Sequence, residues 1–201
     1  CEALAPENVL CVMMPSPFSS EGSIKDSEEL VRNLGCESRI EPISATFEVL
    51  LKQMNLHKPT KGGESLAAEN MQSRIRGVIL MAISNSEGRL LLSTGNKSEL
   101  AVGYCTLYGD MCGALAPIGD LYKLQVYALS QAIAASGGGI PEHSLTRAPS
   151  AELRPNQTDQ DSLPPYDVLD PLLKDYLEAQ LGVPELEKKH GAGFKSPTLS
   201  E

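Results

Sequence analysis

Residues 93–103 combine side chains that can bind phosphate with a position where a strand meets a helix. They follow the apolar run 90–92 and supply a hydroxyl on Thr94, an ammonium on Lys97 and a carboxylate on Glu99. Such a carboxylate can hold Mg²⁺ between phosphates. At the carboxyl end of a strand in an open α/β sheet, this combination predicts a nucleotide or anion site. The alternative is a capped helix, with Ser or Asn as the cap and Glu in the first turn.

A second group of polar residues falls on two predicted helices. Asn70 and Arg74 are adjacent at i and i+4 on one helix, which fits a binding site or a solvated face. Lys123 lies in the first turn of another helix, where the dipole disfavours a cation. An anion between Lys123 and the helix, either a phosphate or a carboxylate, would explain this position. A solvated lysine is the alternative.

An alternation of strands and helices must position these residues. Apolar runs and helical periodicity predict the following elements: strands at 9–14, 39–43 and 89–93, and helices at 23–35, 45–55, 65–83, 120–135 and 166–181. Asp120 is the predicted cap of its helix, and Gly35 the predicted end of the first. The alternation predicts an α/β fold with a doubly wound parallel sheet. The loop 15–22, at the carboxyl end of the first strand, is a second candidate wall of the site.

Composition excludes several classes of protein. The chain has 201 residues, enough for one domain, and its formal net charge of −9 and lack of Trp argue against nucleic-acid binding. Its five cysteines form no C-x-x-C pair, which favours a reducing compartment over a disulfide scaffold or a zinc site. No apolar run is long enough to span a membrane, and the first residues do not show the basic and apolar pattern of a leader. A cytoplasmic protein without a membrane partner is therefore expected.

Six short motifs occur in an order that resembles one family over about residues 7–181. The motifs are Pro15-Ser-Pro-Phe-Ser-Ser, Asn70-Met-Gln-Ser-Arg-Ile-Arg76, Ser93-Thr-Gly-Asn-Lys-Ser-Glu99, Tyr108-Gly-Asp110, Ile118-Gly-Asp-Leu-Tyr-Lys123 and Pro149-Ser-Ala-Glu-Leu-Arg-Pro-Asn-Gln-Thr-Asp-Gln-Asp161. Each motif alone is weak, but the set closely resembles the synthetase domain of glutamine-dependent NAD⁺ synthetases. That family has a Rossmann-like fold of the adenine nucleotide alpha hydrolase (ATP pyrophosphatase) type.

The resemblance implies an activity and its ligands. Family members adenylate the nicotinate carboxylate of deamido-NAD⁺ with ATP and then displace AMP with ammonia, with Mg²⁺ as the metal. The resemblance implies three contacts to ATP, from Thr94, Lys123 and Ser150. It implies four contacts to deamido-NAD⁺, from Asn70, Arg74, Glu99 and Asp110, and makes Glu99 the ligand of Mg²⁺. No side chain is assigned as a catalytic acid, base or nucleophile, and a homodimer or higher homo-oligomer is expected.

Three departures from the family pattern bear on activity. The pyrophosphate-binding loop Ser-Gly-Gly-x-Asp-Ser has no counterpart in this sequence, and neither has the glutaminase domain that delivers ammonia. The basic family segment Asn-Glu-Tyr-Lys-Arg-Arg-Gln is also without a match. The expected organisation is a ligase domain over 1–182, without its first strand and pyrophosphate-binding loop, and a disordered or irregular tail over 183–201. Activity of this chain is expected to be impaired.

Two other functions remain open at this point. One is a catalytically dead nucleotide-binding or dimerisation module, which the absent pyrophosphate-binding loop favours. The other is a different amidating ligase of the ATP pyrophosphatase type, acting on a nucleotide base or an amino acid.

Overall fold

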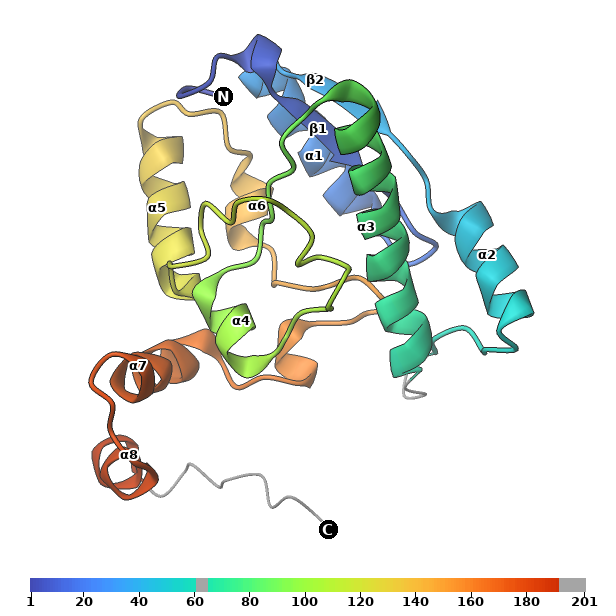
Figure 1. The fold of residues 1–201 in the computed structure, drawn as a ribbon. Coiled ribbons are helices and arrows are strands. Elements are labelled where there is room, and N and C mark those ends of the chain that lie inside the picture. The colour runs from blue at the N-terminus through green and yellow to red at the C-terminus, as the bar shows by residue number, and fades with distance from the viewer. Residues whose placement is uncertain (61–64, 192–201) are drawn as a thin grey trace.

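The structure is a computed structural model that describes residues 1–60 and 65–191. Its elements, in chain order, are η1 (Pro6–Asn8), β1 (Leu10–Met13), α1 (Glu21–Leu34), β2 (Glu37–Ile40), α2 (Ser44–Gln53), α3 (Leu66–Glu87), α4 (Lys97–Val102), α5 (Lys123–Ala135), α6 (Glu142–Thr146), η2 (Asp159–Asp161), α7 (Tyr166–Leu177) and α8 (Val183–His190). Figure 1 shows their arrangement.

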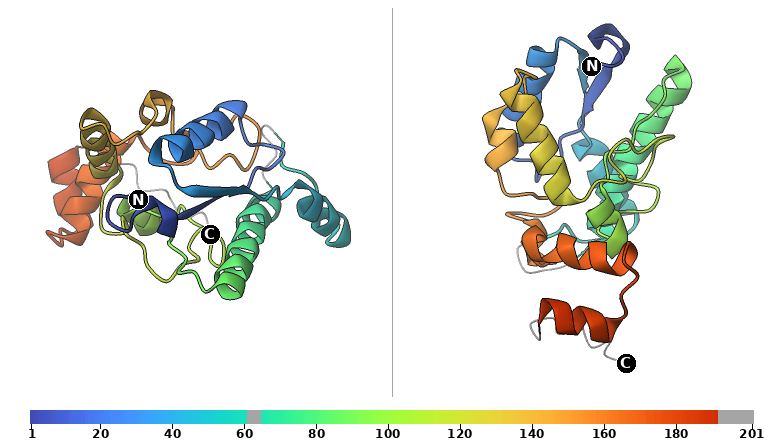
Figure 2. Two further views of the ribbon diagram at one scale, coloured as in Figure 1. Left: turned by 90° about the horizontal axis from the view of Figure 1, so that it is seen from above. Right: turned by 90° about the vertical axis from the view of Figure 1, so that its left-hand side faces the viewer.

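A short parallel sheet forms one end of the molecule. β1 and β2 pair in parallel, with Leu10 opposite Glu37 and Met13 opposite Ile40, and α1 is the crossover between them. Figure 2 shows α1 and α3 on opposite sides of this sheet. Parallel strands with helices on both sides confirm the predicted α/β fold class.

The prediction of a third strand at residues 89–93 is wrong. In this segment only Leu92 pairs, through an isolated parallel bridge to Leu115. The amide of Ser93 donates to the Leu115 carbonyl at 2.9 Å, so the segment is held in place without becoming part of the sheet. An apolar run predicts an extended segment, but a strand also needs a partner of comparable length.

Local sequence signals explain the well-predicted helices. The Ser20 hydroxyl accepts a hydrogen bond from the Ser23 amide and caps α1, and Gly35 ends α1 in the left-handed conformation at φ 65°. The predictions for α2 and α3 also lie close to the observed helices. The end at Gly35 was predicted from the sequence, whereas the predicted start at residue 23 falls two residues after the observed start at Glu21, because Ser20 is the cap.

Several predictions for the C-terminal half of the chain need correction. Asp120 does not cap α5, which begins at Lys123 with Tyr122 as its N-cap residue. α7 ends at Leu177, short of the predicted position 181. The predicted irregular tail is wrong for residues 183–190, which form α8 with Leu186 buried. Gly191 follows α8 as its C-cap residue, and residues 192–201 of that tail lie outside the described residues.

Two hydrophobic clusters hold these elements together. The first joins α2 and α3 through Ile43, Phe47, Leu51, Ala68 and Ile75. The second joins the start of α5 to α7 through Tyr122, Tyr166, Leu169 and Leu173. Within the part of the chain that the structure describes, no helix is both long and apolar enough to cross a membrane.

α3 lies against the segment 106–112 with almost no space between them. A Cβ on Gly77 would lie 2.8 Å from the Tyr108 carbonyl oxygen, and one on Gly109 would lie 2.7 Å from the Ser73 Cβ. Real Cβ atoms do not approach other atoms this closely. Glycine at these two positions therefore fixes how closely α3 approaches Asp110.

Candidate functional site

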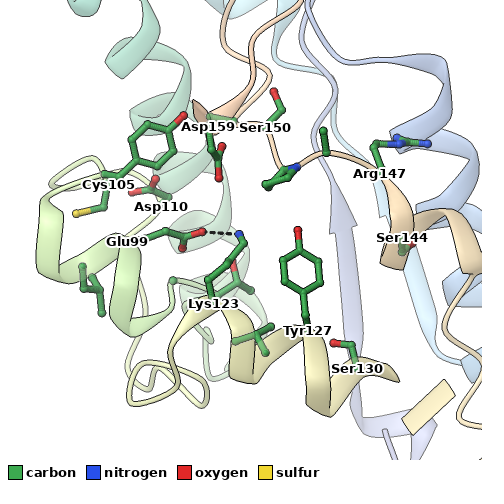
Figure 3. Close-up of a pocket in the computed structure, with 18 of the residues that line it drawn as sticks. Glu99, Cys105, Asp110, Lys123, Tyr127, Ser130, Ser144, Arg147, Ser150 and Asp159 are labelled. Carbon is green, nitrogen blue, oxygen red and sulfur yellow. Dashed lines mark hydrogen bonds and ion pairs between the residues drawn. The ribbon is translucent and has the colours of Figure 1, made fainter. Parts of the chain in front are cut away.

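A cavity of about 490 Å³ lies between α4, α5 and the chain from residue 144 to residue 159 (Figure 3). This volume falls within the range of about 300–1,000 Å³ that is typical of small-molecule sites. Most of the predicted site residues lie on its wall, namely Thr94, Glu99, Asp110, Lys123 and Ser150. The cavity is therefore the candidate site.

An ion pair between Glu99 and Lys123 spans the cavity wall. The Lys123 Nζ donates to Glu99 Oε1 at 2.9 Å, and Figure 3 shows the pair bridging α4 and α5. Both side chains are mostly shielded, with 20% and 16% of their surface exposed. Partial burial strengthens such a pair relative to one in water. The two helices thus present one cation and one anion to the same space.

Both interpretations of the segment 93–103, a capped helix and a binding site, apply to α4. The Asn96 side chain accepts from the Glu99 amide at 3.0 Å, and Glu99 Oε2 accepts from the Asn96 amide at 3.1 Å. This reciprocal capping box fixes the start of α4. The same Glu99 faces the cavity, as does Thr94. A capped helix and a binding site are therefore compatible here.

The N-terminus of α5 is held by a buried carboxylate from α7. Ser98 Oγ accepts from the Lys123 amide at 2.9 Å and donates to Asp170 Oδ1 at 2.6 Å. Asp170 Oδ2 accepts from the Leu124 amide at 2.8 Å. Asp170 thus supplies the anion that the helix dipole favours, beside the Glu99 carboxylate. The position of Lys123 is explained by carboxylates of the protein itself.

Ser150 lies in a loop with many internal hydrogen bonds. Its hydroxyl donates to the Gln157 carbonyl at 2.6 Å and accepts from the Glu152 amide at 3.1 Å. The Asp159 amide donates to the Pro149 carbonyl at 2.9 Å, and the buried Asp159 carboxylate accepts from Tyr166 at 2.7 Å. These bonds give the loop a defined shape along the cavity.

The four residues predicted for the dinucleotide separate in space. Glu99 and Asp110 lie on the cavity wall, but among the described residues that wall includes neither Asn70 nor Arg74. Asn70 accepts from the Thr106 hydroxyl at 2.8 Å, and Arg74 Nε donates to the Leu107 carbonyl at 3.2 Å. Both support, from α3, the turn whose Thr106 amide donates to Asp110 at 2.6 Å.

Lys97, the other cation of the segment 93–103, lies outside the cavity wall. Its Nζ donates to Asp120 at 3.0 Å and Glu178 at 3.2 Å, and it stands 4.9 Å from the centre of the Tyr122 ring. Lys97 therefore ties α4 to α7, and Lys123 is the lysine that faces the site.

Sequence reasoning missed several residues of the cavity wall. Tyr127 lines the cavity one helical turn after Lys123, so its i+4 spacing was a usable signal. Asp159 and Arg147 also line it, but they come from a polar stretch without periodicity. Figure 3 shows the Tyr127 hydroxyl directed toward the loop that carries Ser150.

Two side chains on the cavity wall, Tyr127 and Cys105, hold their protons more tightly than usual. Burial raises the pKa of the Tyr127 phenol. Partial desolvation, and then the carboxylates of Asp110 and Glu99, raise the pKa of the Cys105 thiol. A thiol that keeps its proton is a poor nucleophile. The cavity therefore suits binding and charge stabilisation better than covalent catalysis.

The carboxylates of the cavity wall suit a metal ion only when a bound ligand supplies the other donor atoms. Among residues 1–60 and 65–191 there is no group of three or more His, Cys, Asp and Glu side chains that could hold a metal ion. A Mg²⁺ bound with a nucleotide needs only one or two carboxylates, because phosphates and waters complete its shell. Glu99 and Asp110 offer those carboxylates on the cavity wall.

A comparison with protein families finds one match over nearly the whole chain. The model of the NAD synthase family matches residues 1–196. Among curated proteins, the chain is similar to the glutamine-dependent NAD⁺ synthetase of Synechocystis sp., with 53% identity over 197 residues. It is also similar to the glutamine-dependent NAD⁺ synthetase of Thermotoga maritima, with 46% identity over 202 residues.

These matches cover very different shares of the two chains. They include 96% and 98% of this chain but 34% of each relative. The chain therefore spans about a third of the length of the curated relatives that it matches.

Solved structures give a consistent picture. Glutamine-dependent NAD⁺ synthetase from Acinetobacter baumannii, in complex with ADP, has a TM-score of 0.68 and 38% identity. That match covers 94% of this chain and 33% of the other. NMN synthetase from Francisella tularensis has a TM-score of 0.73 and 26% identity, covering 90% of this chain and 72% of the other.

Proposed function

Because the chain belongs to the NAD synthase family, we propose that it is the ligase part of a glutamine-dependent NAD⁺ synthetase. Its substrates would be deamido-NAD⁺, ATP and ammonia, and its products NAD⁺, AMP and pyrophosphate. The observation that carries the proposal is the Lys123–Glu99 pair, which faces a cavity of ligand size from two helix N-termini. The curated relatives named above support the choice of substrate.

The reaction has two steps whose demands match this cavity. A nicotinate carboxylate oxygen attacks the α-phosphorus of ATP, and the bond to the bridging oxygen breaks to release pyrophosphate. Ammonia then attacks the carboxyl carbon of the adenylate, AMP leaves with the C–O electron pair, and nitrogen loses a proton to solvent. Both steps depend on holding anionic reactants together and offsetting charge on the leaving group. The site needs cations and hydrogen-bond donors more than a nucleophile.

Lys123, Thr94 and Ser150 would contact ATP. The Lys123 ammonium would offset the phosphate charge by sharing or exchanging its contact with Glu99. Ser150 already uses its only O–H on the Gln157 carbonyl. In this arrangement Ser150 can only accept a further hydrogen bond. It therefore fits a ribose hydroxyl or the adenine amino group and not a phosphate oxygen.

Asp110, Glu99, Asn70 and Arg74 would serve deamido-NAD⁺. Asp110 and Glu99 face the cavity, where their carboxylates can accept from ribose hydroxyls. Asn70 and Arg74 would act from behind the 106–110 turn, which they support. Glu99 would be the main protein ligand of Mg²⁺ when the nucleotide brings it, and bound Mg²⁺ neutralises phosphate charge.

Assembly and location are part of the same proposal. We expect a homodimer or higher homo-oligomer in the cytoplasm, with ammonia supplied by a glutaminase domain outside these 201 residues. All five cysteines are free, which agrees with a reducing compartment. Neither nucleic acid nor membrane is an expected partner.

An assay of NAD⁺ formation tests the proposal. The chain is incubated with ATP, Mg²⁺, deamido-NAD⁺ and ammonium, and AMP and NAD⁺ are followed. A second version is extended at its N-terminus with the strand and the Ser-Gly-Gly-x-Asp-Ser loop that the family resemblance predicts. We expect turnover in the extended version and little in the chain alone. A folded extended version that makes no NAD⁺ contradicts the proposal.

A second candidate is amidation of a pyridine mononucleotide. The likeness to the NMN synthetase of Francisella tularensis supports it, although identity there is 26% against 53% for the Synechocystis relative. The same assay with nicotinate mononucleotide in place of deamido-NAD⁺ separates the two. Faster turnover of the mononucleotide would favour the second candidate.

A further inference from the structure

The loop that carries Ser150 is attached to α1 by two oppositely charged residues. Arg147 precedes Ser150 and Glu152 follows it, and both reach the first turns of α1. The Arg147 guanidinium donates to Asp26 Oδ2 at 2.6 Å and to the Ser23 hydroxyl at 2.9 Å. These contacts join positions more than 120 residues apart in the sequence.

Glu152 completes the attachment from the other side. Its carboxylate accepts from the Ser23 hydroxyl at 2.6 Å and from the Ser20 amide at 3.3 Å. Ser23 thus accepts from Arg147 and donates to Glu152, so that one hydroxyl links both charges. Glu152 has a φ of 51°, a left-handed conformation that is unusual outside glycine. Such a conformation persists only where the surroundings hold it.

Gly22 of α1 leaves space for the Arg147 guanidinium. A Cβ on Gly22 would lie 2.9 Å from the Arg147 Cζ, so a side chain at that position would displace it. Figure 3 shows Arg147 extended toward α1 and away from the Lys123–Glu99 pair. Arg147 lines the cavity, yet the described hydrogen bonds of its guanidinium go to α1 and its N-cap, Ser20.

The position of Ser150 follows from these two anchors. The Glu152 amide donates to Ser150 Oγ, and the Leu153 amide donates to the Gln157 side chain at 2.8 Å. Gln72 of α3 donates to the Leu153 carbonyl at 2.8 Å and adds a third attachment. Between Arg147 and Glu152, residues 148–151 form a continuous part of the cavity wall.

We propose that Arg147 and Glu152 are positioning residues, which hold the Ser150 wall of the cavity against α1 at the distance that a nucleotide requires. The hydrogen bonds of both side chains go to the start of α1 and not to the Lys123–Glu99 pair. The choice of ATP as the ligand rests on the proposed function, whereas the attachment of the wall does not. Losing either charge would free the wall to move without disturbing Lys123 or Glu99.

Amide hydrogen exchange and ATP binding together test this proposal. The variants are Arg147→Ala and Glu152→Gln in the full chain, with Arg32→Ala as the matched control. Arg32 is an exposed arginine of α1, the helix to which the loop is attached. Its substitution by alanine removes one positive charge, as Arg147→Ala does. Thermal unfolding of each variant confirms that it is folded. Both readouts use the chain without any assay of turnover.

We expect the backbone amides of Glu152, Leu153 and Asp159 to exchange about tenfold or more faster in the first two variants, with α3 and α7 unchanged. If the wall occupies its positioned conformation in only about one tenth of the molecules, the apparent Kd of ATP rises about tenfold. The control should match the native chain in both measurements. Restoring the charge with Arg147→Lys should recover part of the protection.

The two proposals fail in different ways. Unchanged exchange at these amides in folded Arg147→Ala and Glu152→Gln chains overturns the positioning role. Unchanged ATP affinity despite a loosened loop also overturns it. If neither the native chain nor its N-terminally extended version binds ATP but the variants still loosen the loop, the attachment stands and the proposed function is contradicted.

Discussion

Lys123 is the side chain that best distinguishes a nucleotide site from a polar cavity. It is the cation of the ion pair on the cavity wall, whereas Lys97 pairs with Asp120 and Glu178 outside that wall. We predict that Lys123→Gln weakens ATP binding and that Lys97→Gln does not. A hydrogen bond to a charged group is worth about 1.5–3 kcal/mol, so Kd should rise roughly 10- to 150-fold.

Isothermal titration calorimetry with ATP and Mg²⁺ checks this prediction. Thermal unfolding provides the control, because Lys97 joins α4 to α7 and its loss should lower stability more than affinity. Equal ATP affinity in the Lys123→Gln and native chains would contradict the assignment of Lys123.

Cys11 gives the protein a pH dependence that is independent of the cavity. Its Sγ lies 3.6 Å from the Cys36 Sγ, and burial, followed by that thiol, raises the pKa of Cys11 to about 11. The unfolded chain loses this proton near pH 8.5, well before the folded one. Because the folded state then holds more protons, stability falls as pH rises from about 8.5 to 11.

A comparison of Cys11→Ala with the native chain isolates this effect. We predict that the melting temperature of the native chain declines more steeply between pH 8.5 and 11 than that of the variant. Other groups that titrate in this range are common to both proteins, so the difference in slope reports Cys11. Parallel slopes would show that the thiol titrates alike in the folded and unfolded states.

At the scale of elements, the contact between α3 and the segment 106–112 should be intolerant of added volume. Alanine at position 77 favours a helix over glycine by about 1 kcal/mol. Its Cβ would lie 2.8 Å from the Tyr108 carbonyl oxygen, and overpacking of this kind costs about 1–3 kcal/mol. We predict that the clash prevails, so that Gly77→Ala lowers the free energy of unfolding in urea.

Gly95→Ala is the control for this prediction. A Cβ on Gly95 would meet its nearest neighbour, in Leu100, at 3.8 Å, which is an ordinary contact. A Gly77→Ala chain more stable than the native one would mean that the segment 106–112 can retreat from α3 without loss.

Elements were predictable where their determinants are local. The left-handed Gly35 ends α1 as predicted, and the predicted start at residue 23 lies two residues from the observed start at Glu21. α5 was misplaced because its N-terminus is held by Asp170, 46 residues further on. Likewise, Lys123 and Glu99 belong to motifs that the sequence displays, whereas Arg147 acquires its role from α1, far away in the chain. Such long-range partners leave no periodic signal.

At the scale of the whole molecule, apolar side chains remain exposed beside the cavity-forming elements. We call Val78, Leu90, Leu92, Tyr108 and Leu115 the apolar face, and each is between 41% and 80% exposed. The bridge brings Leu92 next to Leu115, and the close approach of Gly77 to Tyr108 brings α3, which carries Val78, against the segment 106–112. An exposed apolar patch of this kind marks an interface more often than a free surface.

The proposed homo-oligomer makes a testable claim about this face. We predict that the chain associates with increasing concentration in sedimentation velocity, and that Val78→Asp shifts it toward the monomer, because a charge at an apolar contact must lose its hydration. Val168→Asp on α7, at a position 54% exposed, is the matched control and should leave the mass unchanged. A native chain that stays monomeric at every concentration contradicts self-association. Equal effects of the two substitutions would place the contact between copies elsewhere than on α3, since only Val78 belongs to the apolar face.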